Sequence, residues 1–286
     1  MTHHIGIGRY VQHRGGARAV LHVHENNIGT RSLNFIDAIF EAGAEVFGLD
    51  AIDGIGRTGL PDHQARMVLG ENFIQATEHV GRGLLRLDIS VLGTGSSSLA
   101  GPDGAHFAYP ARLEDALKQQ LPGNEIKVTA HVQPKQTTAN MLGSLDKILA
   151  EDHPSLVIWQ AGTADAINGV ETEDFRSSLE DGIDKIQAAG ADVILMNMQY
   201  SPRTASMLDV SAYADVMRHV AQQRNALLFD RLAIMQYWNE IGTFDLYTAT
   251  KKYDMARQVH ECIGRALASQ IISAAHLDAV RMQTTR

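Results

Sequence analysis

The sequence predicts an α/β fold in which a parallel β-sheet is covered by helices on both faces. From residue 87 onward, short apolar runs alternate with segments whose apolar residues recur every three or four positions. Residues 156–159 and 193–196 are continuously apolar, as strands buried on both faces are. Repeated strand–helix units of this kind build a parallel sheet between two helical layers.

Five segments are the predicted strands of this sheet. Each is a short apolar or β-branched run that ends at turn residues or leads into a helical pattern. They cover residues 87–92, 126–130, 156–159, 193–196 and 226–229.

Five segments between and after these strands are predicted helices. Residues 109–117 and 137–149 form the first two. The other three carry apolar residues at helical spacing: Phe175, Leu179, Ile183 and Ile186; then Tyr213, Val216, Met217 and Val220; and finally Met255, Val259, Ile263, Ala266 and Leu267. Gly190 is the expected end of the third helix, because glycine readily adopts the left-handed conformation there.

Composition excludes several classes of protein. The chain has 286 residues, of which 44% are hydrophobic and 20% charged, so a packed core is expected. Its net charge is −8 and no run of Lys or Arg occurs, which argues against a nucleic-acid or anionic-membrane partner. The single cysteine, Cys262, allows no intrachain disulfide.

The printed N-terminus, MTHHIGIGRY, lacks the apolar centre of a signal peptide, and no apolar run is long enough to span a membrane. A cytoplasmic protein without membrane insertion is therefore expected as the sequence is written, and an exported one if the natural start differs. Residues 84–275 are predicted to form one domain, and residues 1–80 an extension of unknown role. The extension is expected to pack on the domain's edge, unless residues 18–23 add a strand to the sheet.

A glycine-framed serine cluster, Gly93-Thr-Gly-Ser-Ser-Ser-Leu-Ala-Gly101, follows the first predicted strand. Ligands of open parallel sheets bind at the carboxyl ends of strands, so this segment could present a nucleophilic hydroxyl beside free backbone N–H groups. From the spacing alone, a turn that caps the next helix is the favoured interpretation. A phosphate-binding loop is disfavoured because the lysine of that motif is missing.

Several segments, in order and at similar spacing, resemble the conserved blocks of the SGNH (GDSL-type) hydrolases, an esterase family. They are Gly95–Gly101 followed by Tyr109–Leu113, then Gln136–Leu142, Trp159–Asp165, Ala188–Met196 with Gln199–Pro202, and Cys262–Ala268. The resemblance implies a flavodoxin-like three-layer α/β/α sandwich with a parallel five-stranded sheet. It also implies a strand-end serine nucleophile that attacks acyl esters.

The resemblance carries site residues onto this chain with several substitutions. Ser97 is the nucleophile if the family spacing to the closing glycine is kept, and Ser96 is the nearest hydroxyl if the strand is aligned without a gap. Lys135 replaces the glycine that lends a backbone N–H to the oxyanion, and it still supplies that N–H if its backbone conformation is tolerated. Ala164 replaces the asparagine donor, with Thr163 as the nearby substitute.

The block before the last helix departs most from the family pattern, normally Asp-x-x-His. Lys251 falls on the aspartate and Asp254 on the histidine, and the nearest histidine is His260. The expected triad is therefore Ser97, His260 as base, and Asp254 or another acid to orient the imidazole. Asp254 also has a plain structural reading as the N-cap of a helix that starts at Met255.

Three other features have simple structural readings. Gly54–Gly59 fits a dinucleotide-binding pattern but is read as a turn, because a convincing βαβ context is lacking. His22 and His24 have the spacing of same-face strand residues, but no carboxylate or cysteine partner is placed for a metal. Asp165 and Asp192 border strand ends and are read as surface residues. No cofactor is expected.

Two functions remain open. The first is a serine esterase that acts on a small-molecule or carbohydrate ester, for example an O-acetylated sugar. The second is a degenerate family member that keeps the fold and binds its ligand without turnover. Whether His260 reaches the serine cluster separates the two. The sequence leaves the oligomeric state open.

Overall fold

A five-stranded parallel sheet forms the centre of the protein, with strand order β2-β1-β3-β4-β5. The computed structural model describes residues 85–101, 103–247 and 253–275. The strands are β1 (Arg86–Gly93), β2 (Glu125–Val132), β3 (Leu156–Gln160), β4 (Asp192–Met196) and β5 (Leu227–Phe229). All five predicted strands and the predicted fold class are confirmed.

The helices that follow these strands include all five predicted ones. These are α4 (Tyr109–Gln120), α5 (Thr138–Asp152), α7 (Thr172–Ala188), α9 (Ser211–Gln223) and α11 (Tyr253–Ala274). The described residues also contain α3 (Gly104–Phe107), α6 (Thr163–Asn168), α8 (Pro202–Ala205), α10 (Arg231–Glu240) and the 3₁₀ turn η2 (Gly95–Ser97). Most of these additional elements are too short to show a helical period in the sequence.

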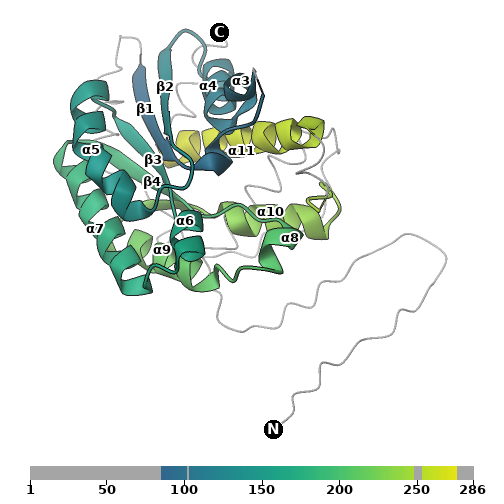
Figure 1. Ribbon diagram of the computed structural model, residues 1–286. Helices are drawn as coiled ribbons and strands as arrows, with labels where there is room; N and C mark the ends of the chain where they lie inside the picture. Colours follow the sequence, from purple (N-terminus) through teal and green to yellow (C-terminus); the bar gives the residue numbers. More distant parts are fainter. Residues whose placement is uncertain (1–84, 102, 248–252, 276–286) are drawn as a thin grey trace, which may run out of the picture.

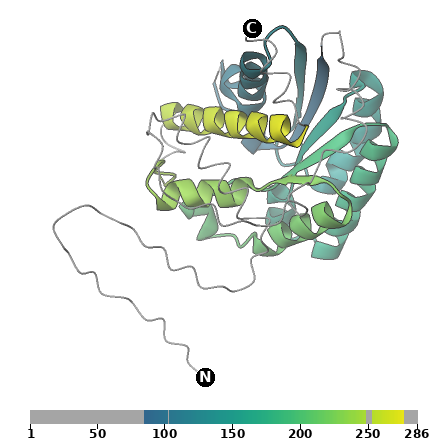
Figure 2. The same cartoon turned by 180° about the vertical axis from the view of Figure 1, so that it is seen from behind.

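The helices form two layers, as Figures 1 and 2 show. Helices α5, α7 and α9 lie side by side on one face of the sheet, and α4 and α11 pack together on the other. Strand β3 is buried along its whole length and sends alternate side chains into the two layers. Ile158 joins the core under α4 and α11, and Trp159 joins the core under α5, α7 and α9.

The loops that leave β1, β3 and β4 meet at the carboxyl edge of the sheet. Backbone hydrogen bonds continue past the strands: Ala161 N donates to Met196 O at 3.2 Å, and Asn197 N donates to Phe229 O at 3.4 Å. The segments that follow the strands therefore lie along this edge, and the serine cluster, which follows β1, is among them.

Some expectations lie outside the described residues. They concern the extension 1–80, the strand at residues 18–23, the turn Gly54–Gly59, and the pair His22 and His24. Within the described part of the chain, no helix is both long and apolar enough to cross a bilayer.

Ile158→Ala should lower the free energy of unfolding by roughly 2–5 kcal/mol, because it opens a cavity in the central strand. Ile158 is fully buried, whereas the side chain of Ile167 on α6 is 66% exposed. The matched variant Ile167→Ala should change stability by no more than about 0.5 kcal/mol. Equal effects in a denaturant titration would mean that β3 is not central to the core.

Two glycines in helices offer a second matched pair. A Cβ at Gly182 on α7 would lie 2.1 Å from Cζ3 of Trp159, whereas a Cβ at Gly143 on α5 would meet no atom within 4 Å. Gly182→Ala should therefore destabilise the protein by about 1–3 kcal/mol through overpacking. Gly143→Ala should stabilise it by about 0.5–1 kcal/mol, because alanine is the better helix former. Thermal unfolding of both variants tests this; a stabilising Gly182→Ala would contradict the packing described here.

Candidate active site

The serine cluster folds into the turn η2 directly after β1, and the carboxamide of Gln160 holds two of its hydroxyls. Ser97 Oγ donates to Gln160 Oε1 and lies 3.2 Å from the hydroxyl of Tyr109. Gln160 Nε2 donates to Ser96 Oγ. Ser97 and Gln160 are each 1% exposed, whereas Ser96 is partly exposed. Of the two serines bound to Gln160, Ser96 is the one open to solvent.

Gly93 at the end of β1 allows Ser97 to turn inward. A Cβ at Gly93 would lie 2.1 Å from Ser97 Oγ. Any other residue at this position would push the Ser97 hydroxyl away from Gln160. Gly93, the first residue of the cluster, thus allows Ser97 to pack against the end of the sheet.

His260 is buried on α11, and its Nδ1 accepts a hydrogen bond from Tyr109 N at 3.0 Å. Burial, and secondarily the positive charge of Arg231, lowers the pKa of His260 from 6.5 to about 3. The ring is therefore neutral at pH 7, and because Nδ1 accepts, the proton resides on Nε2. A triad base needs the opposite tautomer, in which Nε2 accepts the serine proton.

Asp254 lies in the first turn of α11, with its side chain 89% exposed and 4.0 Å from Nη1 of Arg257. It lines a cavity of about 560 Å³ beside Phe107 and Arg257, between α4 and α11. Among the described residues α11 begins at Tyr253, two residues before the expected start at Met255, so the expectation that Asp254 is the N-cap of this helix is wrong. Helix ends are shifted easily, because sequence patterns mark the apolar face better than the first residue.

The described contacts do not join Ser97, His260 and Asp254 into one chain of hydrogen bonds. Ser97 is bonded to Gln160 and Tyr109, His260 to the backbone of Tyr109, and Asp254 faces solvent. Six residues along a helix separate His260 from Asp254, about 9 Å of axial rise. The triad remains a prediction from the resemblance.

The predicted oxyanion positions differ in whether they can still donate a hydrogen bond. Lys135 has φ = 66°, the left-handed region that favours glycine, so the chain keeps the glycine-like backbone here although the residue has changed. Ala164 is 5% exposed at the start of α6 and has no donor side chain. The nearby Asn168 Nδ2 does not replace it, because it donates back to Ala164 O at 2.6 Å.

Thr163 offers a hydroxyl beside Ala164. Its Oγ1 is enclosed and has no hydrogen-bond partner among the described residues. Thr163 lines a cavity of about 170 Å³ together with Met198, Gln199 and Ser201, which follow β4. An enclosed hydroxyl without a partner is costly, and it could donate to a ligand in this cavity only after a small movement of its surroundings.

Arg231 is a functional candidate that the sequence reading missed. It is the first residue of α10 and is fully buried. Its Nη1 donates to Ser96 O at 3.1 Å, its Nη2 donates to Gln199 Oε1 at 3.3 Å, and its guanidinium carbon lies 5.5 Å from the ring centroid of Tyr109. The signal was present, because Arg231 follows the fifth predicted strand at the ligand-binding edge.

Gln160 and Asp165 were also underestimated. Gln160 is the last residue of β3, where its amide reaches both serines. Asp165 is buried, not on the surface as expected: it accepts from Thr138 N at 2.9 Å, Thr138 Oγ1 at 3.0 Å and Gly162 N at 3.3 Å. Asp192 is buried as well, at 6% exposure. Carboxylates at strand ends can satisfy the free N–H groups of helix starts, which sequence position alone does not reveal.

Comparison with known proteins identifies the family to which this chain belongs. The sequence profile of the non-GDSL lipase-like family matches residues 64–277, which is more than half of the chain. The chain belongs to this family. Its kinship with the SGNH/GDSL-type hydrolases, expected from the sequence blocks, is thereby confirmed.

Two curated relatives are similar in sequence, and one solved structure is similar in fold. An arylesterase of Vibrio mimicus is 30% identical over 33% of this chain and 46% of its own length. The esterase TesA of Pseudomonas aeruginosa is 28% identical over 48% of this chain and 67% of its own length. The fold matches that of Axe2, an acetylxylan esterase from Geobacillus stearothermophilus, with a TM-score of 0.52 and 17% identity over 66% of this chain and 94% of that one.

The chain thus spans less than half the length of one of these curated relatives and two thirds of the other. In the described part of the chain, no group of three or more His, Cys, Asp or Glu side chains is placed to hold a metal ion.

The buried imidazole should make stability depend on pH. His260 keeps its neutral form in the folded protein down to about pH 3, whereas the unfolded chain protonates near 6.5. Its contribution is therefore complete above about pH 6.5 and is lost as the pH falls. Between about pH 7 and pH 5, the free energy of unfolding should fall by about 2 kcal/mol on this account.

Denaturant titrations of the wild type and of His260→Gln at both pH values measure this effect. The variant should lack the acid-sensitive part of the slope, and exposed His219→Gln controls for the loss of a histidine as such. A wild type and a His260→Gln variant with the same pH slope would show that burial does not hold this ring neutral.

Proposed function

We propose that this protein is a slow SGNH-type esterase for small acyl esters, in which the hydroxyl of Ser96 attacks the ester carbonyl. One observation carries the proposal. The serine segment that resembles the family's strand-end block forms a turn after β1, and Gln160 Nε2 donates to the hydroxyl of the partly exposed Ser96. This is the edge at which open parallel sheets bind their ligands.

Ser96 is preferred to Ser97 because of its surroundings. Ser97 is 1% exposed and its hydroxyl contacts both Gln160 and Tyr109, so it stabilises the turn. A bulky ester could approach Ser97 only if these contacts opened. Ser96 is reachable without such a rearrangement.

Two hydrogen-bond donors are candidates to stabilise the negative charge that develops on the attacked carbonyl oxygen. The backbone N–H of Lys135 is held in a glycine-like conformation, and the hydroxyl of Thr163 is enclosed and unpartnered among the described residues. Together they would take the place of the family's glycine N–H and of the asparagine that Ala164 replaces. Such donors contribute about 10²–10³ each in rate.

The proton of Ser96 has no imidazole acceptor in this arrangement. His260 carries its proton on Nε2, so it cannot accept another while neutral at that atom. We therefore propose that the Ser96 proton passes to solvent hydroxide as the Oγ–carbon bond forms, and that the ester C–O bond breaks as water protonates the departing alkoxide. Hydroxide then attacks the acyl-serine carbonyl, the acyl–Oγ bond breaks, and the acyl group leaves as a carboxylate while Ser96 regains its proton. A positioned base contributes roughly 10²–10⁴ in rate, so turnover should be slower than in a triad enzyme by about that factor.

The substrate should carry a small acyl group. The cavity beside Thr163 is about 170 Å³, below the roughly 300–1,000 Å³ of pockets for drug-sized ligands. An acetyl group on a carbohydrate is our specific proposal for the ester. The acetylxylan esterase that shares the fold gives a substrate with which to test it.

A second function, ligand binding without turnover, is favoured by one specific observation. The tautomer of His260 and the outward position of Asp254 leave the predicted residues Ser97, His260 and Asp254 unjoined as a triad. On this interpretation the enclosed Thr163 hydroxyl and the serine turn, which is the turn η2 at Gly95–Ser97, bind the ester or its product and release it unchanged.

Alanine variants of the three serines separate these possibilities. Ser96→Ala should remove turnover of p-nitrophenyl acetate, and the exposed Ser98→Ala should retain it. Ser97→Ala should mainly lower stability, by about 1–3 kcal/mol, because it leaves Gln160 Oε1 without its donor. A fluorophosphonate should label the peptide that contains Ser96. Retained turnover in Ser96→Ala with loss in Ser97→Ala would return the nucleophile to Ser97, and equal turnover in all three would reject a serine mechanism.

The pH–rate profile tests the route of the proton. Without an imidazole base, kcat for p-nitrophenyl acetate should rise continuously between about pH 6 and pH 9 instead of levelling off above the pKa of a histidine. A plateau that disappears in His260→Gln would contradict the proposed route. No turnover and no labelling at any pH would leave the binding function.

A further inference from the structure

Arg231 is a buried cation without an acidic partner among the described residues. Its side chain is 0% exposed, and its recorded contacts are the Ser96 carbonyl, the Gln199 amide oxygen and the face of Tyr109. Burial lowers the pKa of Arg231 to about 10, and the nearby phenol of Tyr109 opposes this shift. The guanidinium therefore stays charged at pH 7.

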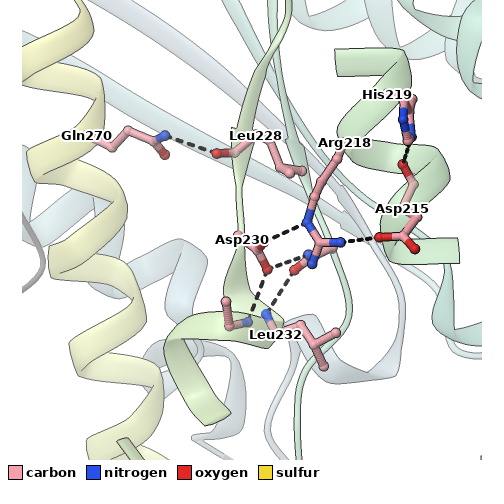
Figure 3. A network of polar contacts seen from close by, with 9 residues as sticks. Asp215, Arg218, His219, Leu228, Asp230, Leu232 and Gln270 are labelled. Atoms are coloured by element: carbon pink, nitrogen blue, oxygen red, sulfur yellow. Dashed lines mark hydrogen bonds and ion pairs between the residues drawn. The ribbon is translucent and has the colours of Figure 1, made fainter. Parts of the chain in front are cut away.

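The neighbouring carboxylate of Asp230 does not neutralise this charge, because it is committed elsewhere. Asp230 Oδ1 accepts from Asn197 Nδ2 at 2.7 Å and from Ala233 N at 3.0 Å. Its Oδ2 pairs with Arg218 Nε at 3.2 Å, as Figure 3 shows. The partly exposed Arg218, and not the buried Arg231, is the ionic partner of this acid.

The guanidinium of Arg231 also has unused hydrogen-bonding capacity. A guanidinium has five N–H donors, and the described residues accept two hydrogen bonds from it. Its Nε is buried and has no acceptor among them. An uncharged side chain with N–H groups could make the same contacts to two neutral acceptors and an aromatic ring. These contacts therefore do not explain why the residue at this position is a charged arginine.

A buried, unpaired charge is among the costliest features of a folded protein. It is expected where an opposite charge arrives or develops, since fixed charges in a partly dry site act strongly over several ångströms. Arg231 bonds to the carbonyl of Ser96, a partly exposed residue whose hydroxyl is held by Gln160 in the same turn. An anion seated on the Ser96 side chain would face this cation across one peptide group.

We propose that the serine turn is a binding site for small anions, carboxylates above all, with Arg231 as its buried countercharge. The inference rests on the site of the proposed function, whose hydrolysis product is a carboxylate, but it does not require turnover. Arg231 contributes its charge from behind the turn and fixes the Ser96 backbone. It is thus a specificity-determining and positioning residue.

Acetate and acetamide test the proposal, because they have nearly the same shape and differ in charge. At constant ionic strength, titrations followed by the amide resonances of Ser96 and Ser97 should show tighter binding of acetate by about tenfold or more. Arg231→Met should bind the two probes equally, and Arg231→Lys should keep much of the preference. The matched control Arg218→Met should keep it fully, because Arg218 is 41% exposed and paired with Asp215 and Asp230.

A second measurement covers the case in which Arg231→Met does not fold. In the wild type, the Nε–H resonance of Arg231 should shift with acetate and saturate at the same concentration as the Ser96 amide. Equal affinity for acetate and acetamide in the wild type would overturn the proposal. So would a preference that persists in Arg231→Met, or an Arg231 resonance that does not move while the Ser96 amide does.

These outcomes are separate from those for the esterase. Preferential acetate binding without turnover of p-nitrophenyl acetate would support the anion site and reject the esterase. Turnover without any preference for acetate over acetamide would support the esterase and reject the anion site.

Discussion

The hydrogen bonds of the Gln160 carboxamide determine the geometry of the whole serine turn. One amide donates to Ser96 and accepts from Ser97, so the two hydroxyls are oriented together by a group at the end of the central strand. Burial of Gln160 makes these bonds costly to break. A buried amide without partners has given up its hydrogen bonds to water and gains none from the protein in return. The same strand carries Ile158 and Trp159 into the two cores, so the turn is attached to the best-packed part of the fold.

Electrostatics around this turn follow from two buried groups that affect each other. Arg231 brings a positive charge close to the end of the sheet, and that charge, added to burial, keeps the imidazole of His260 neutral. Tyr109 contacts both groups, since its ring lies under the guanidinium and its backbone N–H donates to His260. The result is a site with a fixed cation and a histidine committed to the backbone, which suits the stabilisation of an anion better than the removal of a proton.

The fold could be predicted from the sequence because its determinants are periodic. The apolar runs of β3 and β4 and the helical spacing of residues such as Phe175 and Leu179 appear directly in the chain. The site was less predictable, because its contacts join residues far apart in sequence, such as Ser96 with Gln160 and Arg231. Only the fold decides which serine turns inward, which nitrogen of a histidine accepts, and whether a strand-end aspartate is exposed.

The substitutions in the family's blocks differ in their physical consequences. Where the resemblance implies a backbone N–H, a new side chain can be tolerated, and Lys135 adopts the left-handed conformation that glycine favours. Where the family uses a side-chain amide, Ala164 removes the donor altogether, and the fold offers only the enclosed hydroxyl of Thr163 beside it. Where the family uses a charge-oriented histidine, the nearest imidazole is committed to Tyr109 N. A backbone N–H can thus persist through a change of residue at which a side-chain donor is lost, so the described residues at this edge differ from the family pattern mainly in their side-chain donors and charges.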